Sequence, residues 1–224
     1  PAKEHFAGKG RTVQYREGLY VGYRYYQTAD VAPAFPFGFG LSYTSFAYSD
    51  LKATSDSVTL TVTNTGSCDG AEIVQIYVAK PDAKVFRPVQ ELKGFEKVKL
   101  AAGESKCVAI PLDDKAFRYW NTMTNAWEIE GGHYEIRVGA SCEDIRLTAT
   151  VEVAGTGAPN PYAGISLPHY ESGKVMNVPD AEWEVLLDRP IPDDTVKIDC
   201  NMTLGELKHS RSPLCWLVWL GPYT

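Results

Sequence analysis

The stretch GAEIVQIYV, residues 70–78, decides the fold class of this chain. Valine and isoleucine recur at every second position from Val74 to Val78, which is the spacing of a β-strand with one face on a core. Their β-branched side chains favour a strand over a helix. Ile73 and Tyr77 occupy the opposite phase, where a solvated face would normally be polar. This second face is therefore expected to meet another apolar surface.

The same alternation recurs before and after this stretch and is interrupted by turn signals, such as NTG at 64–66 and the Gly131–Gly132 pair. About seven half-buried strands are expected over residues 47–154, which predicts an immunoglobulin-like, antiparallel β-sandwich in a mainly β chain. Gly94 interrupts one strand and is expected to mark a β-bulge. The side chains expected to point into the core are Val62, Val74, Ile76, Val98, Val108, Ile110, Tyr134, Ile136, Val138 and Leu147.

Residues 1–46, which precede the alternating strands, are rich in aromatic side chains and have little polar alternation. Residues 20–26 are expected to form an extended strand whose two faces are both largely apolar or aromatic. The chain contains too little material to bury such a strand. We therefore expect it to pack against a domain that lies outside this sequence.

After the strands, residues 155–168 read as a linker in which Gly, Pro, Ala and Asn dominate. Asp180 is expected to N-cap a short helix that stops at Pro190. TLGE at 203–206 fits a capping box. Residues 155–224 are thus expected to form a linker and a partly helical C-terminal extension.

Composition and charge limit the classes of partner. A net charge of −6 argues against nucleic acid and leaves no basic patch for a membrane surface. The longest apolar run, residues 214–220, is far too short to cross a bilayer. Five cysteines without ligand spacing predict free thiols, which slightly favour the cytoplasm, although a bridge between two strand cysteines stays open. No motif for a metal or cofactor is present; the cysteines are Cys68, Cys107, Cys142, Cys200 and Cys215.

Two aromatic blocks, YREGLYVGYRYY at 15–26 and FPFGFGLSYT at 35–44, are followed by further ordered motifs. These motifs are VTNTG at 62–66, GAEIVQIYV at 70–78, RP at 87–88, ELKGFEKV at 91–98, GES at 103–105, FRYW at 117–120 and GHYEIRVG at 132–139. Together they resemble the C-terminal part of family 3 glycoside hydrolases, the β-glucosidases and β-xylosidases, with their fibronectin type III-like domain. The resemblance covers roughly residues 11–150, and the tail from residue 160 resembles the C-terminal extension of some bacterial members.

The resemblance implies three regions: residues 1–46 end the α/β sandwich catalytic domain and cross out of it, 47–154 form the fibronectin type III-like domain, and 155–224 form the linker and extension. In these enzymes an Asp nucleophile on a (β/α)8 barrel and a Glu acid/base, typically on the α/β sandwich, hydrolyse terminal β-glycosides with retention. That chemistry needs the two carboxyls about 5 Å apart. Neither motif is present, so no catalytic residue is assigned here and the enzyme activity is left to the parent protein.

The expected partners follow from the same resemblance. They are the missing catalytic domains of the same protein and the carbohydrate substrate of the parent, while a homo-oligomer stays open. The non-catalytic chain would stabilise those domains. Two alternatives remain, a carbohydrate-binding module and a structural interaction or spacer domain, because a fold does not fix a function.

Individual polar residues that invite a catalytic reading have simpler explanations. Glu17 is expected to pair with Arg16 or Arg24 at a domain junction. Asp113 and Asp114 are adjacent and point to opposite sides of an extended segment, so a turn with solvated charges is expected. The histidines, His5, His133, His169 and His209, lack ligand spacing and are expected at the surface. The serines Ser42 and Ser105 lack the context of a nucleophile elbow.

Aromatic residues offer one further kind of site. Five of them either stack on a sugar or pack in the core and corners of the sandwich, and packing is the favoured interpretation: Phe86, Phe117, Tyr119, Trp120 and Trp127. The resemblance implies that the loop Ala83–Val89 leans toward the active-site rim of the missing catalytic domains, because loops of this domain can approach the entrance to the site in related enzymes. Phe86 and Arg87 on this loop are the candidate substrate-binding residues.

Overall fold

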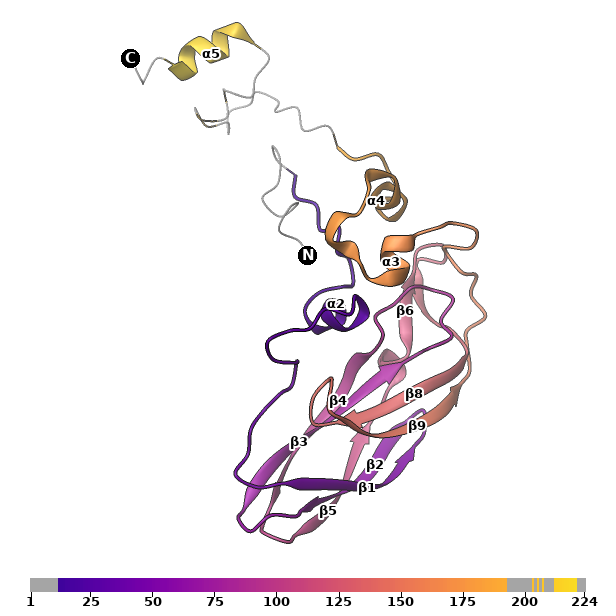
Figure 1. Cartoon of the computed structure of the whole chain (residues 1–224). Coiled ribbons are helices and arrows are strands. Elements are labelled where there is room, and N and C mark those ends of the chain that lie inside the picture. Colours follow the sequence, from indigo (N-terminus) through magenta and orange to yellow (C-terminus); the bar gives the residue numbers. More distant parts are fainter. Residues whose placement is uncertain (1–11, 193–202, 204, 206, 208–211, 221–224) are drawn as a thin grey trace. The chain divides into compact units, whose positions relative to one another are not determined.

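A computed structural model describes residues 12–192, 203, 205, 207 and 212–220 of this chain (Figure 1). The chain divides into two compact units. One unit is Leu19–Lys174. The other combines the described residues up to Gly18 with those from Val175 onward.

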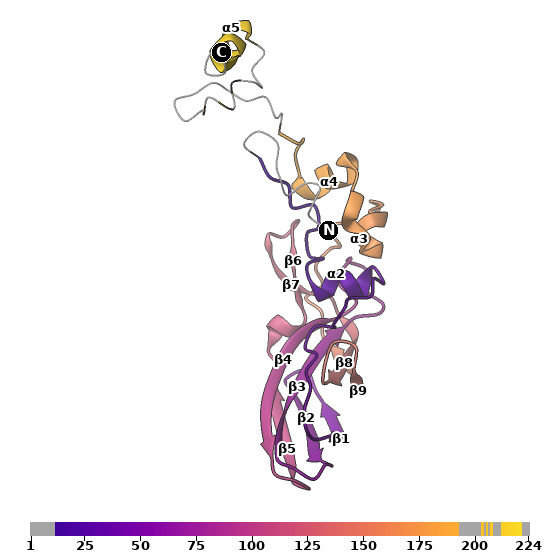
Figure 2. The same ribbon diagram turned by 60° about the vertical axis from the view of Figure 1, so that its left-hand side comes forward.

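The Leu19–Lys174 unit is an antiparallel β-sandwich, which confirms the predicted fold class (Figures 1 and 2). One sheet has the order β1–β2–β5 and the other the order β4–β3–β8–β9, while β6 and β7 form a separate hairpin. The strands are β1 (Phe46–Ala53), β2 (Ser57–Asn64), β3 (Gly70–Ala79), β4 (Glu91–Leu100), β5 (Ser105–Pro111), β6 (Arg118–Asn121), β7 (Ala126–Ile129), β8 (Gly132–Gly139) and β9 (Ile145–Val153). A 3-10 turn, η1 (Asp114–Ala116), precedes β6.

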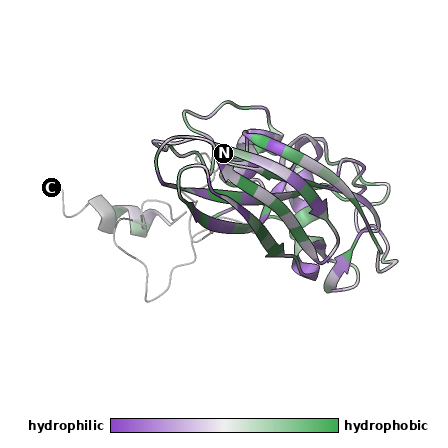
Figure 3. Ribbon diagram, turned by 90° about the horizontal axis from the view of Figure 1, so that it is seen from below, coloured by the Kyte–Doolittle hydropathy of each residue, from purple (hydrophilic) through white to green (hydrophobic). Residues whose placement is uncertain are grey.

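The core lies between the two larger sheets and follows the alternation of the sequence. In β2 every second side chain is buried, and hydrophobic residues alternate with hydrophilic ones along the strands (Figure 3). Because successive side chains of a strand point to opposite faces, this alternation places one row against the facing sheet. Nine of the ten predicted core residues are buried, and Leu147 is half-buried against the same cluster.

The predicted bulge at Gly94 is confirmed. Ile76 pairs with Gly94, but the next residue of β3, Tyr77, pairs with Leu92, so β4 carries one extra residue. A Cβ at Gly94 would lie 2.7 Å from Ile110 Cγ2 of the facing sheet, which explains why glycine occupies the bulge.

The expected extended strand at residues 20–26 is wrong. Gly22, with φ of 59°, turns the chain into a short helix, α2 (Tyr23–Thr28). Tyrosine favours strands mainly because its ring packs on a half-buried sheet, so the preference reflects packing rather than backbone conformation. Here Tyr20 and Tyr25 are buried, and Tyr20 bonds to Tyr170 and packs near Phe86 of the same unit, so Tyr20 already has partners within this chain.

Helix α2 covers part of the outer face of β3. This is the second face of the strand, which the sequence predicted to meet another apolar surface. Tyr23 packs edge-on against Tyr77, with ring centroids 6.1 Å apart, and its hydroxyl accepts a hydrogen bond from the Leu92 amide, 2.8 Å. Tyr77 is fully buried as a result, whereas Ile73 on the same face stays exposed.

The C-terminal part of the chain contains short helical elements: α3 (Pro168–Ser172), η2 (Val175–Asn177), α4 (Asp180–Leu187) and α5 (Pro213–Leu220). The predicted helix at Asp180 exists, but Pro179 is its N-cap and Asp180 is the first helical residue, so the predicted cap is one residue off. The predicted capping box at 203–206 includes residues 204 and 206, which lie outside the described part of the chain. None of the described helices is long and apolar enough to span a bilayer.

Candidate functional site

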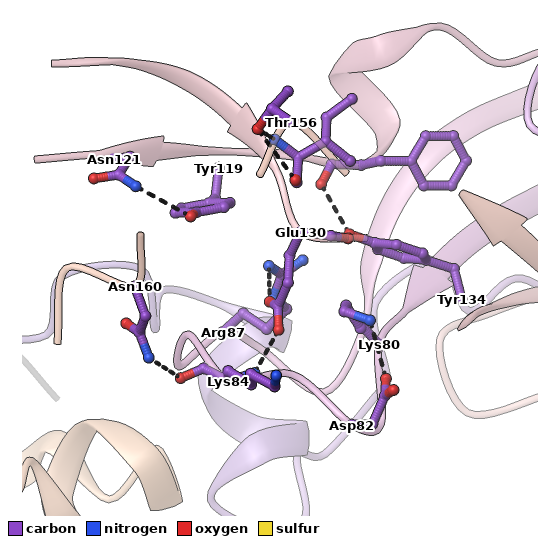
Figure 4. Close-up of polar contacts among 12 residues, drawn as sticks. Lys80, Asp82, Lys84, Arg87, Tyr119, Asn121, Glu130, Tyr134, Thr156 and Asn160 are labelled. Carbon is purple, nitrogen blue, oxygen red and sulfur yellow. Dashed lines mark hydrogen bonds and ion pairs between the residues drawn. The ribbon is translucent and has the colours of Figure 1, made fainter. Parts of the chain in front are cut away.

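The loop that joins β3 to β4, residues 80–90, carries both candidate rim residues and is called the β3–β4 loop below. It begins with a tight turn in which the Ala83 amide donates to the Lys80 carbonyl at 3.2 Å. The Lys80 ammonium pairs with Asp82 at 3.0 Å and lies 4.8 Å from the ring centre of Tyr134 (Figure 4). The buried Lys80 stem thus fixes the start of the loop against the core.

Arg87 forms an ion pair with Glu130, the residue that follows β7. The guanidinium Nη2 lies 2.9 Å from Glu130 Oε2, and both side chains are mostly buried, with 16% and 13% of their surface exposed. Glu130 Oε1 accepts a second hydrogen bond from the Lys84 amide at 2.6 Å (Figure 4). The guanidinium also lies 5.8 Å from the Tyr119 ring centre. One carboxylate therefore fixes both the charge and the backbone of the loop.

Phe86 is enclosed by three tyrosines, which together with it form an aromatic box. Its ring centre lies 4.9 Å from that of Tyr162, 5.4 Å from that of Tyr170 and 6.5 Å from that of Tyr20. The Tyr20 hydroxyl donates a hydrogen bond to the Tyr170 carbonyl. Burial raises the pKa of Tyr20 well above its ordinary value, so this hydroxyl keeps its proton and stays a donor.

An open groove of about 470 Å³ runs along the β3–β4 loop and is also lined by Thr28, Arg137 and Glu171. Glu171 is the single carboxylate among the described residues that line it. A retaining glycosidase needs two opposed carboxyls about 5 Å apart. The groove can therefore border a ligand but lacks a catalytic pair of its own.

The five aromatic residues considered for sugar stacking do not form one platform. Phe117 is buried in the core against Tyr134, and Phe86 lies in the aromatic box. Trp120 and Trp127 are both exposed and face each other across the β6–β7 hairpin, with their ring planes 77° apart. Perpendicular rings cannot stack together on one flat sugar chain. Core and corner packing thus accounts for Phe117 and Phe86, while the tryptophan pair stays available at the surface.

Glu17 does not pair with either expected arginine among the described residues. Arg16 pairs with Asp180 at 2.6 Å and donates to the Val178 carbonyl at 2.8 Å. Arg24 pairs with Glu91 at 3.3 Å. The expected pairing is wrong because partners distant in sequence reach the arginines, and Glu17 itself is buried.

The aspartate pair and the serines behave as expected. Asp113 caps η1 by accepting from the Lys115 amide at 3.0 Å, while Asp114 pairs with Arg118 at 3.1 Å, and both aspartates are exposed. The hydroxyl of Ser105 bonds to that of Thr63, and the hydroxyl of Ser42 accepts from a nearby amide.

The histidines and cysteines form no metal site in the part of the chain that the structure describes. His133 is exposed, as expected, and pairs with Glu152 at 2.6 Å, whereas His169 is half-buried. His5, His209 and Cys200 lie outside the described residues. The four described cysteines are free thiols: Cys68, Cys107, Cys142 and Cys215.

A second surface feature is an apolar stripe between α2 and β1. Its side chains recur at every second residue and are all exposed: Phe35, Phe37, Phe39, Leu41 and Tyr43. Leu41 is 90% exposed and Tyr43 is 101% exposed, while Ile73 of β3 is also exposed. A cavity of about 620 Å³ beside the stripe is lined by Phe39, Leu41 and Ile73 together with charged residues that include Glu72.

Comparison with known proteins gives one family and several relatives. Residues 72–142 match the sequence profile described as "Fibronectin type III-like domain". An exo-α-(1→6)-L-arabinopyranosidase of Bifidobacterium breve is 48% identical over 166 residues, which are 72% of this chain and 22% of that protein. Thermostable β-glucosidase B of Acetivibrio thermocellus is 48% identical over 164 residues, which are 70% of this chain and 22% of that protein.

Among solved structures, the family 3 β-glucosidase of Bifidobacterium adolescentis aligns with a TM-score of 0.67 at 36% identity, covering 97% of this chain and 27% of that one. The sandwich and the matched profile define this chain as one that carries a fibronectin type III-like domain. It is homologous to the C-terminal portion of family 3 glycoside hydrolases of the β-glucosidase type. The chain spans about a fifth of the length of the two curated relatives, 22% in each case.

Proposed function

We propose that this chain is the non-catalytic C-terminal region of a glycoside hydrolase that cleaves terminal β-glycosides with retention. Residues 1–46 then end the catalytic α/β sandwich and cross out of it, residues 47–154 are the fibronectin type III-like domain, and residues 155–224 are the linker and extension. The region stabilises the catalytic domains, and its β3–β4 loop shapes the rim of the active site.

The observation that carries the proposal is the apolar stripe. Contiguous exposed apolar surface usually marks an interaction site, and here it includes side chains as exposed as Leu41 and Tyr43. The relatives supply the occupant, because most of their length lies outside the segment matched by this chain. The catalytic domains of the same protein are therefore the partner of the stripe.

The proposed rim role of Phe86 and Arg87 is indirect. Both side chains are half-buried and engaged with the aromatic box and with Glu130, so they set the shape of the loop. Asp82 and Lys84 on the same loop are exposed and are the groups that a carbohydrate substrate would meet.

A carbohydrate-binding module is the second candidate, and the exposed pair Trp120 and Trp127 is the observation that favours it. Sedimentation of the chain with insoluble glycans distinguishes the two functions. If the chain sediments with the glycan and the Trp120→Ala/Trp127→Ala variant does not, the result supports a binding module. If the wild-type chain stays in the supernatant, the result supports the structural role. If the chain is only a spacer domain, it should neither sediment with the glycan nor affect the stability of the catalytic domains.

The proposal is tested by the thermal inactivation of the enzyme that contains the catalytic domains followed by this chain. Leu41→Ser/Tyr43→Ser should lower the inactivation temperature while leaving the fold of the isolated chain intact, because both side chains are exposed in it. Lys106→Ser, also at an exposed position, serves as the control. Equal inactivation of the stripe variant, the control and the wild type would refute docking through the stripe.

A further inference from the structure

Residues 156–173, called the C-terminal strap below, pass from the β6–β7 hairpin over the β3–β4 loop. The Thr156 amide donates to the Ile129 carbonyl at 3.0 Å, and the Asn121 side chain donates to the Pro159 carbonyl at 2.8 Å. These bonds fix the start of the strap to the β6–β7 hairpin, which Glu130 directly follows.

The strap then contacts the loop at successive points. The Asn160 side-chain amide donates to the Lys84 carbonyl at 3.0 Å (Figure 4). Two residues later, Tyr162 packs on Phe86, and Tyr170 of α3 packs on the same ring from the other part of the strap. Tyr170 and Leu167 are almost completely buried, so α3 is a packed element of this unit.

The end of the strap supports the far end of the loop through Thr28. Gly173 has φ of 68°, and a Cβ there would lie 2.7 Å from Thr28 Cγ2, so the strap turns directly over this side chain. Thr28 Oγ1 in turn accepts from the Val89 amide at 3.1 Å. The strap thus touches the beginning, the middle and, through one residue, the end of the loop.

We propose that the C-terminal strap fixes the conformation of the β3–β4 loop, with Tyr162 and Tyr170 as positioning residues. Glu130, at the end of the hairpin, bonds to Lys84 and Arg87. Among the described residues, the aromatic neighbours of Phe86 are Tyr20 and the two strap residues Tyr162 and Tyr170. The loop conformation therefore depends on a segment that lies outside the sandwich. The consequence for substrate binding rests on the proposed function of the loop as a rim.

Amide hydrogen exchange of the whole chain tests this inference, with the amides of Lys84 and Val89 as reporters of the loop. Tyr162→Ala removes one wall of the aromatic box, and we expect these amides to exchange about tenfold faster, since an aromatic contact and local opening are of that order. Tyr43→Ala makes the same chemical change at a fully exposed site and should leave them unchanged. The amides of Ile76 and Val138 in the sheet should not respond to either variant.

Tyr170→Ala could impair folding because Tyr170 is fully buried, so the half-buried Tyr162 and the double variant Asn160→Ala/Tyr162→Ala decide the matter. Unchanged loop exchange in both folded variants would overturn the inference. In the enzyme joined to its catalytic domains, Tyr162→Ala should also raise KM for an aryl β-glycoside several-fold with little change in kcat. Faster loop exchange with an unchanged KM would support the claim that the strap fixes the loop, but it would overturn the proposed role of the loop at the active-site rim.

Discussion

Arg87 and Glu130 form a mostly buried ion pair at 2.9 Å although 43 residues separate them in the sequence. The pair joins the β3–β4 loop to the end of the β6–β7 hairpin, and the same carboxylate also accepts from the Lys84 amide. A single side chain thus connects two parts of the sandwich that no strand pairing links.

Glu130→Ala should therefore lower the free energy of unfolding by about 3–5 kcal/mol, because it leaves a buried guanidinium unpaired and an amide without its acceptor. Glu128→Ala, two residues earlier on β7, removes a carboxylate whose partner is the exposed Thr124 hydroxyl and should cost about 1 kcal/mol or less. Urea denaturation of both variants measures the difference. Equal costs would show that the Arg87–Glu130 pair does not hold the loop.

The core assignment is tested on two isoleucines of the same strand. Ile76 is completely buried and Ile73 is 43% exposed. Ile76→Ala should cost about 2–5 kcal/mol of unfolding free energy through lost burial and a residual cavity, whereas Ile73→Ala should cost about 1 kcal/mol or less. If Ile76→Ala unfolded at the same denaturant concentration as the wild type, the strand phase would be wrong.

The stability of the chain should depend on pH through Glu72. Burial raises the pKa of this carboxyl above its ordinary value of 4.5 in the folded state, although the Ile73 amide and Arg146 oppose the shift. The folded chain then keeps a proton that the unfolded chain has lost. The contribution of Glu72 is therefore most favourable below pH 4.5 and is lost as the pH rises through the folded-state pKa.

Glu72→Gln removes this loss, so its unfolding free energy relative to the wild type should rise as the pH is raised from about 4 to 7. Denaturation midpoints of Glu72→Gln and of the wild type over this pH range measure the change. A Glu72→Gln difference that stayed constant or fell with pH would contradict the assignment.

Substitutions at two glycines of the C-terminal strap distinguish the cost of backbone strain from the cost of a clash with Thr28. Gly164 and Gly173 both have positive φ, of 78° and 68°, but a Cβ at Gly164 would meet nothing within 4 Å. Gly164→Ala should cost about 1–2 kcal/mol from the left-handed backbone alone. Gly173→Ala should cost more and also speed exchange of the Val89 amide, because the added methyl displaces Thr28. Identical effects of the two substitutions would argue against the contact with Thr28.

Much of the sandwich could be predicted because it depends on local alternation. β2 buries every second side chain, and hydrophobic periodicity records that directly. In β3 the predicted inward row Val74, Ile76 and Val78 is buried, although the residues between them are buried as well. β1 was not predicted, since Ser49 and Asp50 interrupt its pattern where its register with β2 shifts. Residues 20–26 were misassigned because a six-residue helix is too short to display a 3.6-residue period against a run of tyrosines.

The candidate site was predicted only in part. The loop with Phe86 and Arg87 was singled out by the resemblance to family 3 glycoside hydrolases and by the aromatic ring of Phe86, and their role as rim residues remains a prediction. Glu130 and Tyr170 were missed because their importance arises from contacts made across the fold, and no local motif connects them to the loop. Finding them from sequence would have required knowing that the hairpin and the strap both return to residues 80–90.

The central claim, that this chain is a non-catalytic region, is tested most directly by the hydrolysis of aryl β-glucosides and aryl α-L-arabinopyranosides by the purified chain alone. We predict a rate equal to that of the solvent blank, because the sequence carries neither the nucleophile motif nor the acid/base motif that retaining hydrolysis needs in this family. Turnover that survives rigorous purification and is lost in a carboxylate variant of this chain, such as Glu17→Gln, would contradict it.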